Sequence, residues 1–239
     1  MLQNIKNKIN RQFRIVKLFL LILTFNNLAN AQFNTEIGYT AAYLKANEVN
    51  SIFRYYNNNQ NSMIDTMKNI NFINGFNAGV IYRAGIMRFA ASWESLTTTR
   101  HSVEGSITGQ EPVSEKKLYF YFNTISGSLS LIKDHIGIGS GIDYNFFRLK
   151  TTKSGISSKV DLIKPEKEFL SSKTFLIINF KVNSKLAIEF KPYIRIPFKK
   201  IDLEPLEDYL NTEKKENLRF ANFIQYGLSF NILNGKQPN

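Results

Sequence analysis

Apolar and polar residues alternate along most of the chain after residue 32. Eight stretches show this period of two, which is typical of β-strands with two different faces. They are residues 33–45, 71–83, 86–99, 117–132, 136–150, 173–183, 186–198 and 220–233. Each stretch is long enough to cross a membrane as a tilted strand, which takes about 9–11 residues. The pattern therefore predicts an all-β protein.

The connections between these stretches alternate between short and long. Tight turns are expected at Ala84-Gly85, Lys133-Asp134-His135 and Ser184-Lys185. The other four connections, residues 46–70, 100–116, 151–172 and 199–219, are long. Short turns at one rim and long loops at the other are typical of outer-membrane barrels, whose long loops face outside. We therefore predict an eight-stranded antiparallel up-and-down transmembrane β-barrel over residues 32–233, with long extracellular loops and a short tail at 234–239.

The two faces of the predicted strands differ in a way that favours a membrane. The polar faces are rich in Gly and Ser rather than Lys and Glu, which suits a narrow barrel interior. The apolar faces carry aromatic residues that are expected to form girdles at the lipid interfaces. These aromatic residues are Tyr39, Tyr43, Tyr82, Trp93, Tyr119, Tyr144 and Tyr226. A soluble periplasmic barrel that binds an apolar ligand is an alternative interpretation.

The first 31 residues have the order of a secretory signal peptide. A basic region from Lys6 to Lys17 precedes the apolar run Leu18–Phe25, and Ala29-Asn-Ala31 follows. This order predicts cleavage after Ala31. The apolar run is shorter than the roughly 20 residues that a membrane-spanning helix needs. We therefore expect an exported protein located in the outer membrane of a Gram-negative bacterium.

Charge and composition narrow the function classes. The formal net charge is +12, but five of the cations lie in the predicted leader, which contains no acid, so +7 remains for the rest of the chain. These charges are spread over the loops, so nucleic acid is not an expected partner. The chain has no cysteine and two separated histidines, so no metal site is recognisable. No cofactor is expected.

Two stretches resemble known outer-membrane barrels. Gln225-Tyr-Gly227-Leu-Ser-Phe230-Asn-Ile232 is similar to the terminal signal that the barrel-assembly machinery reads, although the chain continues to Asn239 instead of ending at an aromatic residue. Glu189-Phe-Lys-Pro192-Tyr193-Ile-Arg-Ile-Pro197-Phe198 resembles the penultimate strand of small outer-membrane barrel-domain proteins of Bacteroidota. The resemblance implies a small eight-stranded barrel of the OmpA and OmpX type. It implies outer-membrane lipid and the assembly machinery as partners, but no activity.

Charged residues recur on the predicted inner face of the barrel. They are Glu36, Arg88, Glu94, Asp143, Lys181, Glu189, Lys191 and Arg195. An isolated buried charge is costly, so these groups are expected to pair with one another. One interpretation is an ion or proton path. The other is a polar network that plugs the interior, and eight strands leave just enough room for side chains to fill it.

One short motif raises the alternative of a lipid-modifying enzyme. Arg100-His101-Ser102-Val-Glu104 provides a His, a Ser and a Glu at the predicted outer rim. Small outer-membrane lipid A deacylases and acyltransferases, to which this motif is similar, also have a His and a Ser near that rim. However, adjacent strand residues point to opposite sides of a sheet. The prediction is therefore that the protein is not an enzyme.

Two loops contain helical spacing of apolar residues. Val49, Ile52, Phe53 and Tyr56 lie on one helical face, and Leu203, Leu206 and Leu210 follow Asp202, which is expected to cap a second helix with Pro205 in its first turn. These helices either cover the barrel mouth or present Val49, Phe53, Leu206 and Leu210 to a protein partner. The predicted function is a structural or accessory barrel that presents surface loops or joins an envelope complex.

Overall fold

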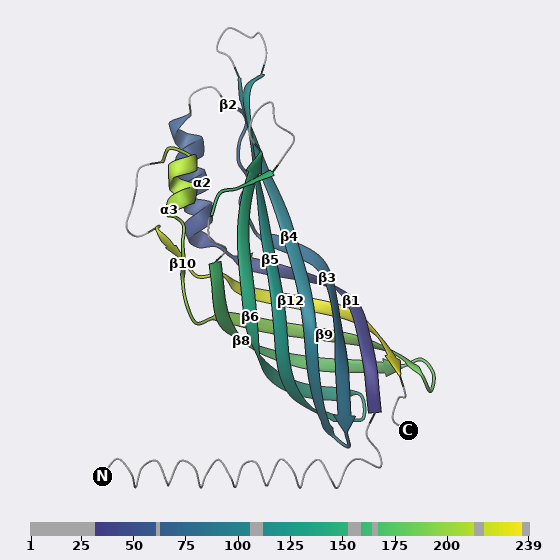
Figure 1. Ribbon diagram of the computed structural model, residues 1–239. Coiled ribbons are helices and arrows are strands. Elements are labelled where there is room, and N and C mark those ends of the chain that lie inside the picture. Colours follow the sequence, from purple (N-terminus) through teal and green to yellow (C-terminus); the bar gives the residue numbers. More distant parts are fainter. Residues whose placement is uncertain are drawn as a thin grey trace, which may run out of the picture.

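Eight long strands form a closed antiparallel barrel (Figure 1). The computed structural model describes residues 32–60, 63–105, 112–152, 159–163, 167–212 and 218–235. The long strands are β1 (Gln32–Lys45), β3 (Phe72–Ala84), β4 (Met87–Gly105), β5 (Pro112–Lys133), β6 (Ile136–Thr152), β8 (Lys167–Lys181), β9 (Leu186–Pro197) and β12 (Ile224–Gly235). Each pairs with the next long strand along the chain, and β1 pairs with β12 to close the sheet. The predicted eight-stranded up-and-down barrel is confirmed.

The short elements lie together at one end of the barrel (Figure 1). They are β2 (Met63–Asp65), β7 (Lys159–Asp161), β10 (Ile201–Asp202), β11 (Phe220–Ala221), α2 (Asn47–Asn59) and α3 (Glu204–Tyr209). We call them, with the adjoining ends of β4, β5 and β6, the head. Within the described residues no helix is long and apolar enough to cross a membrane. The predicted leader, residues 1–31, lies outside the described residues.

The opposite end of the barrel carries three tight turns. Gly85 has φ 59° in the turn between β3 and β4, a left-handed conformation that glycine adopts without a steric penalty. Between β8 and β9, the side-chain oxygen of Asn183 accepts hydrogen bonds from the backbone N–H groups of Lys185 (2.8 Å) and Leu186 (2.9 Å). His135 Nδ1 lies 3.1 Å from the carbonyl oxygen of Asn179. Local hydrogen bonds therefore hold this rim.

Four predicted strand ends are wrong, and one of them is the start of the last strand, which was predicted at residue 220, whereas β12 begins at Ile224. The predicted loop 100–116 is largely strand, because β4 continues to Gly105 and β5 begins at Pro112. Above the membrane the two strands go on pairing, with Ser102 opposite Lys116. Strand β8 begins at Lys167 rather than at residue 173. Sequence alternation marks where a strand contacts lipid, but hydrogen-bonded pairing continues beyond the lipid into the head.

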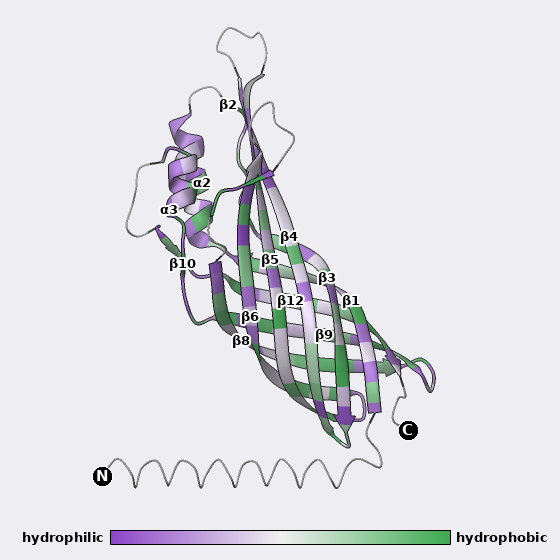
Figure 2. Cartoon of the chain, viewed as in Figure 1, coloured by the Kyte–Doolittle hydropathy of each residue, from purple (hydrophilic) through white to green (hydrophobic). Residues whose placement is uncertain are grey.

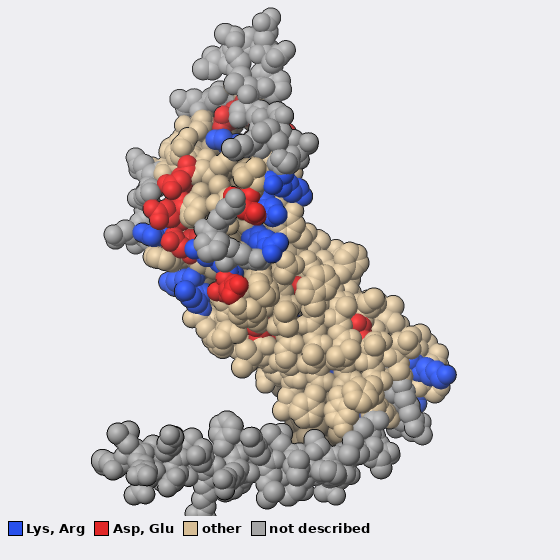
Figure 3. Space-filling view, in the orientation of Figure 1, with Lys and Arg blue, Asp and Glu red and all other residues tan. Residues whose placement is uncertain are grey.

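The outer wall of the barrel is apolar. Figure 3 shows a broad band almost free of charged residues below the head, with Lys, Arg, Asp and Glu gathered on the head itself. Exposed residues of the wall include Ile37, Phe76, Trp93, Ile125, Ile142, Leu176, Ile194 and Leu228. A continuous apolar surface of this extent needs an apolar surrounding, and a closed barrel leaves no unpaired strand edge in lipid. The protein is a transmembrane β-barrel of the outer membrane of a Gram-negative bacterium, with the head at its outer end.

The inside-outside assignment predicts unequal effects of two substitutions at Leu129. This side chain is 45% exposed on the outer wall, where Phe89 and Ser140 are its neighbours on the adjacent strands. We expect Leu129→Arg to cost about 2–4 kcal/mol, the cost of a cation at the bilayer midplane. Leu129→Ala keeps the wall apolar and should cost less. Urea unfolding from lipid vesicles would measure both, and equal tolerance would show that the assignment is wrong.

The interior changes character from one end to the other. On β6 the inward residues near the tight turns are Gly137, Gly139, Gly141, Asp143 and Asn145, and those nearer the head are Phe147 and Leu149. Figure 2 shows hydrophilic and hydrophobic residues alternating along these strands. The inner face of β6 is therefore polar within the membrane and apolar in the head, while buried apolar residues of neighbouring strands, such as Ile132, Phe175 and Ile177, also pack opposite the glycines near the tight turns. In the membrane the apolar residues of the outer wall contact lipid. In the head, which lies in water, the apolar residues are buried inside.

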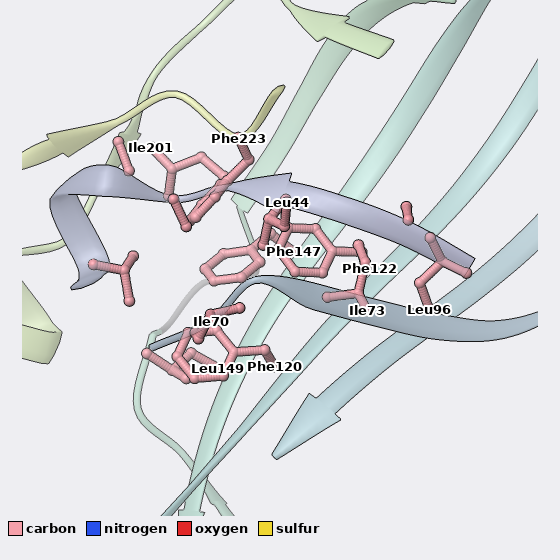
Figure 4. Packing of buried hydrophobic residues seen from close by; sticks show 14 of the residues in the cluster. Leu44, Ile70, Ile73, Leu96, Phe120, Phe122, Phe147, Leu149, Ile201 and Phe223 are labelled. Carbon is pink, nitrogen blue, oxygen red and sulfur yellow. The ribbon is translucent and has the colours of Figure 1, made fainter. Parts of the chain in front are cut away.

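The apolar interior of the head forms one cluster, which we call the head core. Figure 4 shows Phe122, Phe147 and Phe223 packed together with Leu44. The ring centroids of Phe122 and Phe147 are 5.0 Å apart, and those of Phe147 and Phe223 are 5.2 Å apart. Residues from β1, β3, β4, β5 and β6 join the loop segments in this cluster. The head core therefore fixes the loops to the strands that leave the membrane.

Candidate functional site

A group of four charged side chains fills the end of the interior farther from the head. This lower charge cluster consists of Glu36, Arg88, Glu189 and Lys191, all of which are buried. Arg88 donates hydrogen bonds to both carboxylate oxygens of Glu189 and lies 3.4 Å from Glu36. Lys191 Nζ lies 3.2 Å from Glu36 and 3.1 Å from Glu189. Two acids and two bases leave the cluster without net charge.

A second group lies nearer the head. This upper charge cluster consists of Glu94, Asp143, Lys173 and Arg195. Arg195 is its centre, because its guanidinium lies 2.7 Å from Glu94 and 2.5 Å from Asp143. Arg195 also donates a 2.6 Å hydrogen bond to Gln225. The ammonium of Lys173 lies 4.5 Å from the ring centroid of Tyr193. With Glu94, Asp143, Lys173 and Arg195, this cluster also contains two acids and two bases.

Neutral side chains connect the strands between the two clusters. Thr40 Oγ1 accepts a 2.8 Å hydrogen bond from Asn77 and lies 2.8 Å from Ser229 Oγ. Nearer the head, Asn145 donates a 2.8 Å hydrogen bond to Ser171. Paired charges and hydrogen bonds thus occupy the interior up to the head core. This arrangement favours the polar plug over an ion path, because the charges neutralise one another within each cluster.

The structure brings seven of the eight predicted inner charges together, and Lys181 is the exception. It is exposed at the end of β8 beside the turn. Lys181 lies at an odd-numbered position of β8, like the inward residues of this strand, but it lies beyond the end of the packed interior. Lys173 lies eight residues earlier on the same side of β8, inside the upper charge cluster, and it was not among the predicted inner charges. Phe169, Ser171 and Lys173 alternate with outward residues, which would have indicated that Lys173 faces the interior. The predicted strand began only at residue 173, so this alternation was not used.

His101 and Ser102 do not form a catalytic pair. They are neighbours on β4, where His101 is exposed and Ser102 is fully buried. His101 Nε2 lies 3.1 Å from Asp65 on β2. Ser102 Oγ instead faces Tyr56 Oη of α2 at 3.4 Å. A serine nucleophile needs a base within hydrogen-bond reach, and this histidine lies on the other face of the strand.

Tyr56 anchors helix α2 to the sheet of the head. Its hydroxyl donates a 2.5 Å hydrogen bond to Glu104, and Lys116 Nζ lies 3.3 Å from the same carboxylate. Burial, followed by the hydrogen bond to Glu104, raises the pKa of Tyr56. Burial also raises the pKa of Glu104, but the hydrogen bond from Tyr56 and the charge of Lys116 outweigh it, so the net pKa of Glu104 is lowered. Glu104 is therefore ionised and holds the Tyr56 hydroxyl in place.

The four apolar loop residues proposed as a partner surface are buried within the chain itself. Val49, Phe53 and Leu206 have no exposed surface, and Leu210 is 1% exposed. All four belong to the head core. Of the two alternatives, the structure therefore has the one in which the helices cover the barrel mouth, and the alternative of a free partner surface formed by these four residues is wrong, because the helical spacing turns both apolar faces toward the upper strands. The predicted helix at 49–56 corresponds to α2, whose buried residues are Val49, Ile52, Phe53 and Tyr56.

Two asparagines of α2 hold the segment that returns to β3. Asn50 and the backbone of Ile70 exchange two hydrogen bonds of 2.7 and 3.2 Å. Asn57 and the backbone of Met67 exchange two more of 2.9 and 3.0 Å. These residues lie seven positions apart, two turns along the same helical face. The loop is thus a fixed part of the head, and the Asn-rich composition gave no indication of this role.

Helix α3 is fixed from both ends. Asp202 Oδ1 accepts a 3.1 Å hydrogen bond from the backbone N–H of Glu204 and also pairs with Arg219. The N-cap position is occupied by Leu203, one residue after the expected Asp202, and a proline lies in the first turn. Thr151 of β6 donates a 2.6 Å hydrogen bond to Tyr209 Oη. The helix is thereby tied to the top of the barrel.

The residues that resemble an assembly signal lie on both faces of β12. Phe230 and Ile232 are exposed on the outer wall, and Gln225 is buried inside. Gly227 lies directly opposite Tyr193 on β9. A Cβ atom at Gly227 would lie 2.2 Å from the Tyr193 ring, so only glycine lets the ring lie flat against this strand. The strand continues to Gly235, and residues 236–239 lie outside the described residues.

Comparison with known proteins adds a fold likeness. Among the described residues, no group of three His, Asp or Glu side chains is placed to hold a metal ion. No family model matches the chain, and no curated protein matches its sequence. Similar solved structures include Ail, the attachment invasion locus protein of Yersinia pestis, in complex with the heparin analogue sucrose octasulfate. It is 11% identical with a TM-score of 0.44, over 84% of this chain and 98% of Ail. Neisserial surface protein A is 11% identical with a TM-score of 0.41, over 86% and 98%. Both likenesses concern the fold alone.

Proposed function

We propose that the protein is a non-enzymatic outer-membrane barrel whose working part is the head, which it presents outside the cell and joins to another envelope component. The observation that carries this proposal is the head core. Long loops that serve only as connectors have no need of a fixed apolar interior, whereas this head contains two helices whose apolar faces are fully buried. The charge-balanced interior below gives the head a rigid base.

Export and assembly follow from the same proposal. Residues 1–31 act as a signal peptide that is cleaved after Ala31. Residues Gln225, Gly227, Phe230 and Ile232 act as the signal for the barrel-assembly machinery. The resemblance of the stretch Glu189–Phe198 to the penultimate strand of small barrels of Bacteroidota supports an origin in that group.

The partner would contact the polar outer surface of the head. Val49, Phe53, Leu206 and Leu210 are unavailable, so recognition would depend on exposed polar and charged groups. Arg54 on the solvent side of α2 and Lys68 in the following segment are both exposed. Charge pairs at a rim mainly set specificity and association rate. We therefore expect charge reversal at these two positions to weaken association with the partner while leaving the fold intact.

Affinity purification from detergent-solubilised outer membranes tests this function. The wild type should co-purify with a stoichiometric second protein, and the Arg54→Glu/Lys68→Glu variant should lose it. Lys133→Glu/Lys185→Glu, which reverses two exposed charges at the opposite rim, is the matched control and should retain it. A barrel that is recovered alone, with a head that resists protease on intact cells, would contradict an accessory role in a complex.

A further inference from the structure

A groove runs across the outer wall of the barrel where β1, β12 and β9 adjoin. It has a volume of about 670 Å³ and an apolar lining. Ala41, Leu228 and Pro192 line it and are direct neighbours on these three strands. Tyr43 and Tyr226 pair with each other one row nearer the head and line its upper side. An alanine methyl group and a proline ring project less far than these tyrosine rings, so the wall is hollowed along the row of Ala41.

The backbone pairing of β8 with β9 is interrupted beneath the same groove. Pairing runs as far as Phe175 with Tyr193 and resumes at Ile178 with Phe190, and Pro192 lies between. Proline has no N–H group, so it cannot donate a hydrogen bond to the neighbouring strand. Phe175 and Tyr193 are buried and point into the barrel, yet both line the groove. The groove therefore extends down to the backbone of the two strands where their ladder is interrupted.

The groove opens at the outer end of the membrane-spanning wall. The ring of Tyr43 contacts those of Tyr226 and Phe72, with centroids 6.5 and 5.8 Å apart. Phe72 is the first residue of β3, and the exposed Lys45 is the last residue of β1. Tyrosine is enriched at the membrane–water interface, where its ring contacts lipid and its hydroxyl meets polar groups. The groove therefore lies in the outer leaflet, with two tyrosine hydroxyls near the level of the lipid ester groups.

We propose that this groove binds one acyl chain of an outer-leaflet lipid, and that the hydroxyls of Tyr43 and Tyr226 donate hydrogen bonds to ester oxygens of the same lipid. The groove is continuous with the wall that the bilayer surrounds, so an acyl chain enters it without leaving the membrane. The two tyrosines are 44% and 46% exposed, so their hydroxyls can reach the lipid. A chain in this hollow buries more apolar surface than a chain on the flat wall, which favours its retention. The proposal goes beyond the accessory function and needs only the membrane placement of the barrel.

The test measures lipid retention by native mass spectrometry. The protein is reconstituted in vesicles of dipalmitoylphosphatidylcholine, whose headgroup has no net charge, and is then extracted with a nonionic detergent. The wild type should retain a single lipid molecule per barrel. Ala41→Phe and Thr174→Phe fill the groove from opposite sides. Each should weaken retention about tenfold or more, because the loss of two buried methylene contacts already has an effect of this size. Dihexanoylphosphatidylcholine, which has the same headgroup on short chains, should not be retained.

A third phenylalanine, outside the groove, is the matched control. Ala91→Phe places the same ring on the outer face of β4, between Val80 and Gly127 on the adjacent strands. It should retain the lipid as the wild type does, and all three variants should keep their heat-dependent gel mobility. Equal retention in all four proteins, or equal loss in the three variants, would overturn the proposal. Retention of the short-chain lipid would also overturn it, since the headgroup would then be the ligand. So would a protein that purifies from cells in place of the lipid and is released by Ala41→Phe, since the groove would then be a protein contact.

Discussion

Replacing Arg195 with methionine is expected to lower the free energy of unfolding by about 3–5 kcal/mol, the cost of breaking a buried ion pair by removing one partner. Arg195 has no exposed surface and contacts Glu94, Asp143 and Gln225. Its loss leaves two carboxylates against the single cation of Lys173. Urea unfolding from lipid vesicles, followed by the fluorescence of Trp93 on the outer wall, would measure the change. This is the only tryptophan of the chain.

A second substitution separates charge balance from packing. Arg195→Met/Asp143→Asn restores one acid and one base in the upper charge cluster, so part of the lost stability should return. Ile196→Ala, at the next position on the outer wall, is the matched control and should have a smaller effect. If Arg195→Met is no more harmful than Ile196→Ala, then the upper charge cluster contributes nothing to the stability of the barrel.

The fold could be predicted from the sequence because the period of two persists through the part of each strand that lies in the membrane. On β6, for example, Ile138 lies on the outer side of the sheet and Gly139 on the inner side, as their alternation in the sequence predicts. The turns could be predicted because Gly85 and Asp134 mark the positions with positive φ. Local sequence therefore determines the parity of each strand and the position of each tight turn.

The heights of residues in the barrel could not be predicted in the same way. Lys173 and Lys181 share a parity, and only the pairing of β8 with β6 and β9 places one inside and the other at the rim. This pairing depends on residues distant in sequence. The sequence therefore predicted that the interior is charged and named seven of its charged residues, but it placed Lys181 there instead of Lys173.

The head core could not be predicted because both faces of the upper strands are apolar or aromatic. On β5, Tyr119 and Tyr121 point outward while Phe120 and Phe122 point inward. A period-two pattern disappears where both faces are apolar. What covers Phe120 is Phe53 of α2, with 6.3 Å between ring centroids. The sequence predicts a helix in the loop that covers Phe120, but it does not show that the apolar face of this helix packs against the upper strands.

Phe147→Ala is expected to loosen the head while the barrel remains inserted. Phe147 has no exposed surface, and its ring packs against Phe122 and Phe223. Truncating a buried phenylalanine to alanine costs about 3–5 kcal/mol, because contacts are lost and a cavity remains. The charge clusters and the apolar wall lie below this site and are unchanged. We therefore expect normal heat-dependent gel mobility, together with faster cleavage of the head by protease on intact cells.

The adjacent residue provides the control for this experiment. Phe146 points to the outer side of the same strand, where its ring meets Tyr144 at 4.8 Å between centroids. Phe146→Ala removes the same atoms without opening a cavity in the head core, so the head should keep its protease resistance. If the two variants are cleaved at the same rate, the head core does not hold the loops. Faster cleavage of the Phe147 variant alone would show that one buried ring helps to keep the extracellular surface in a single conformation.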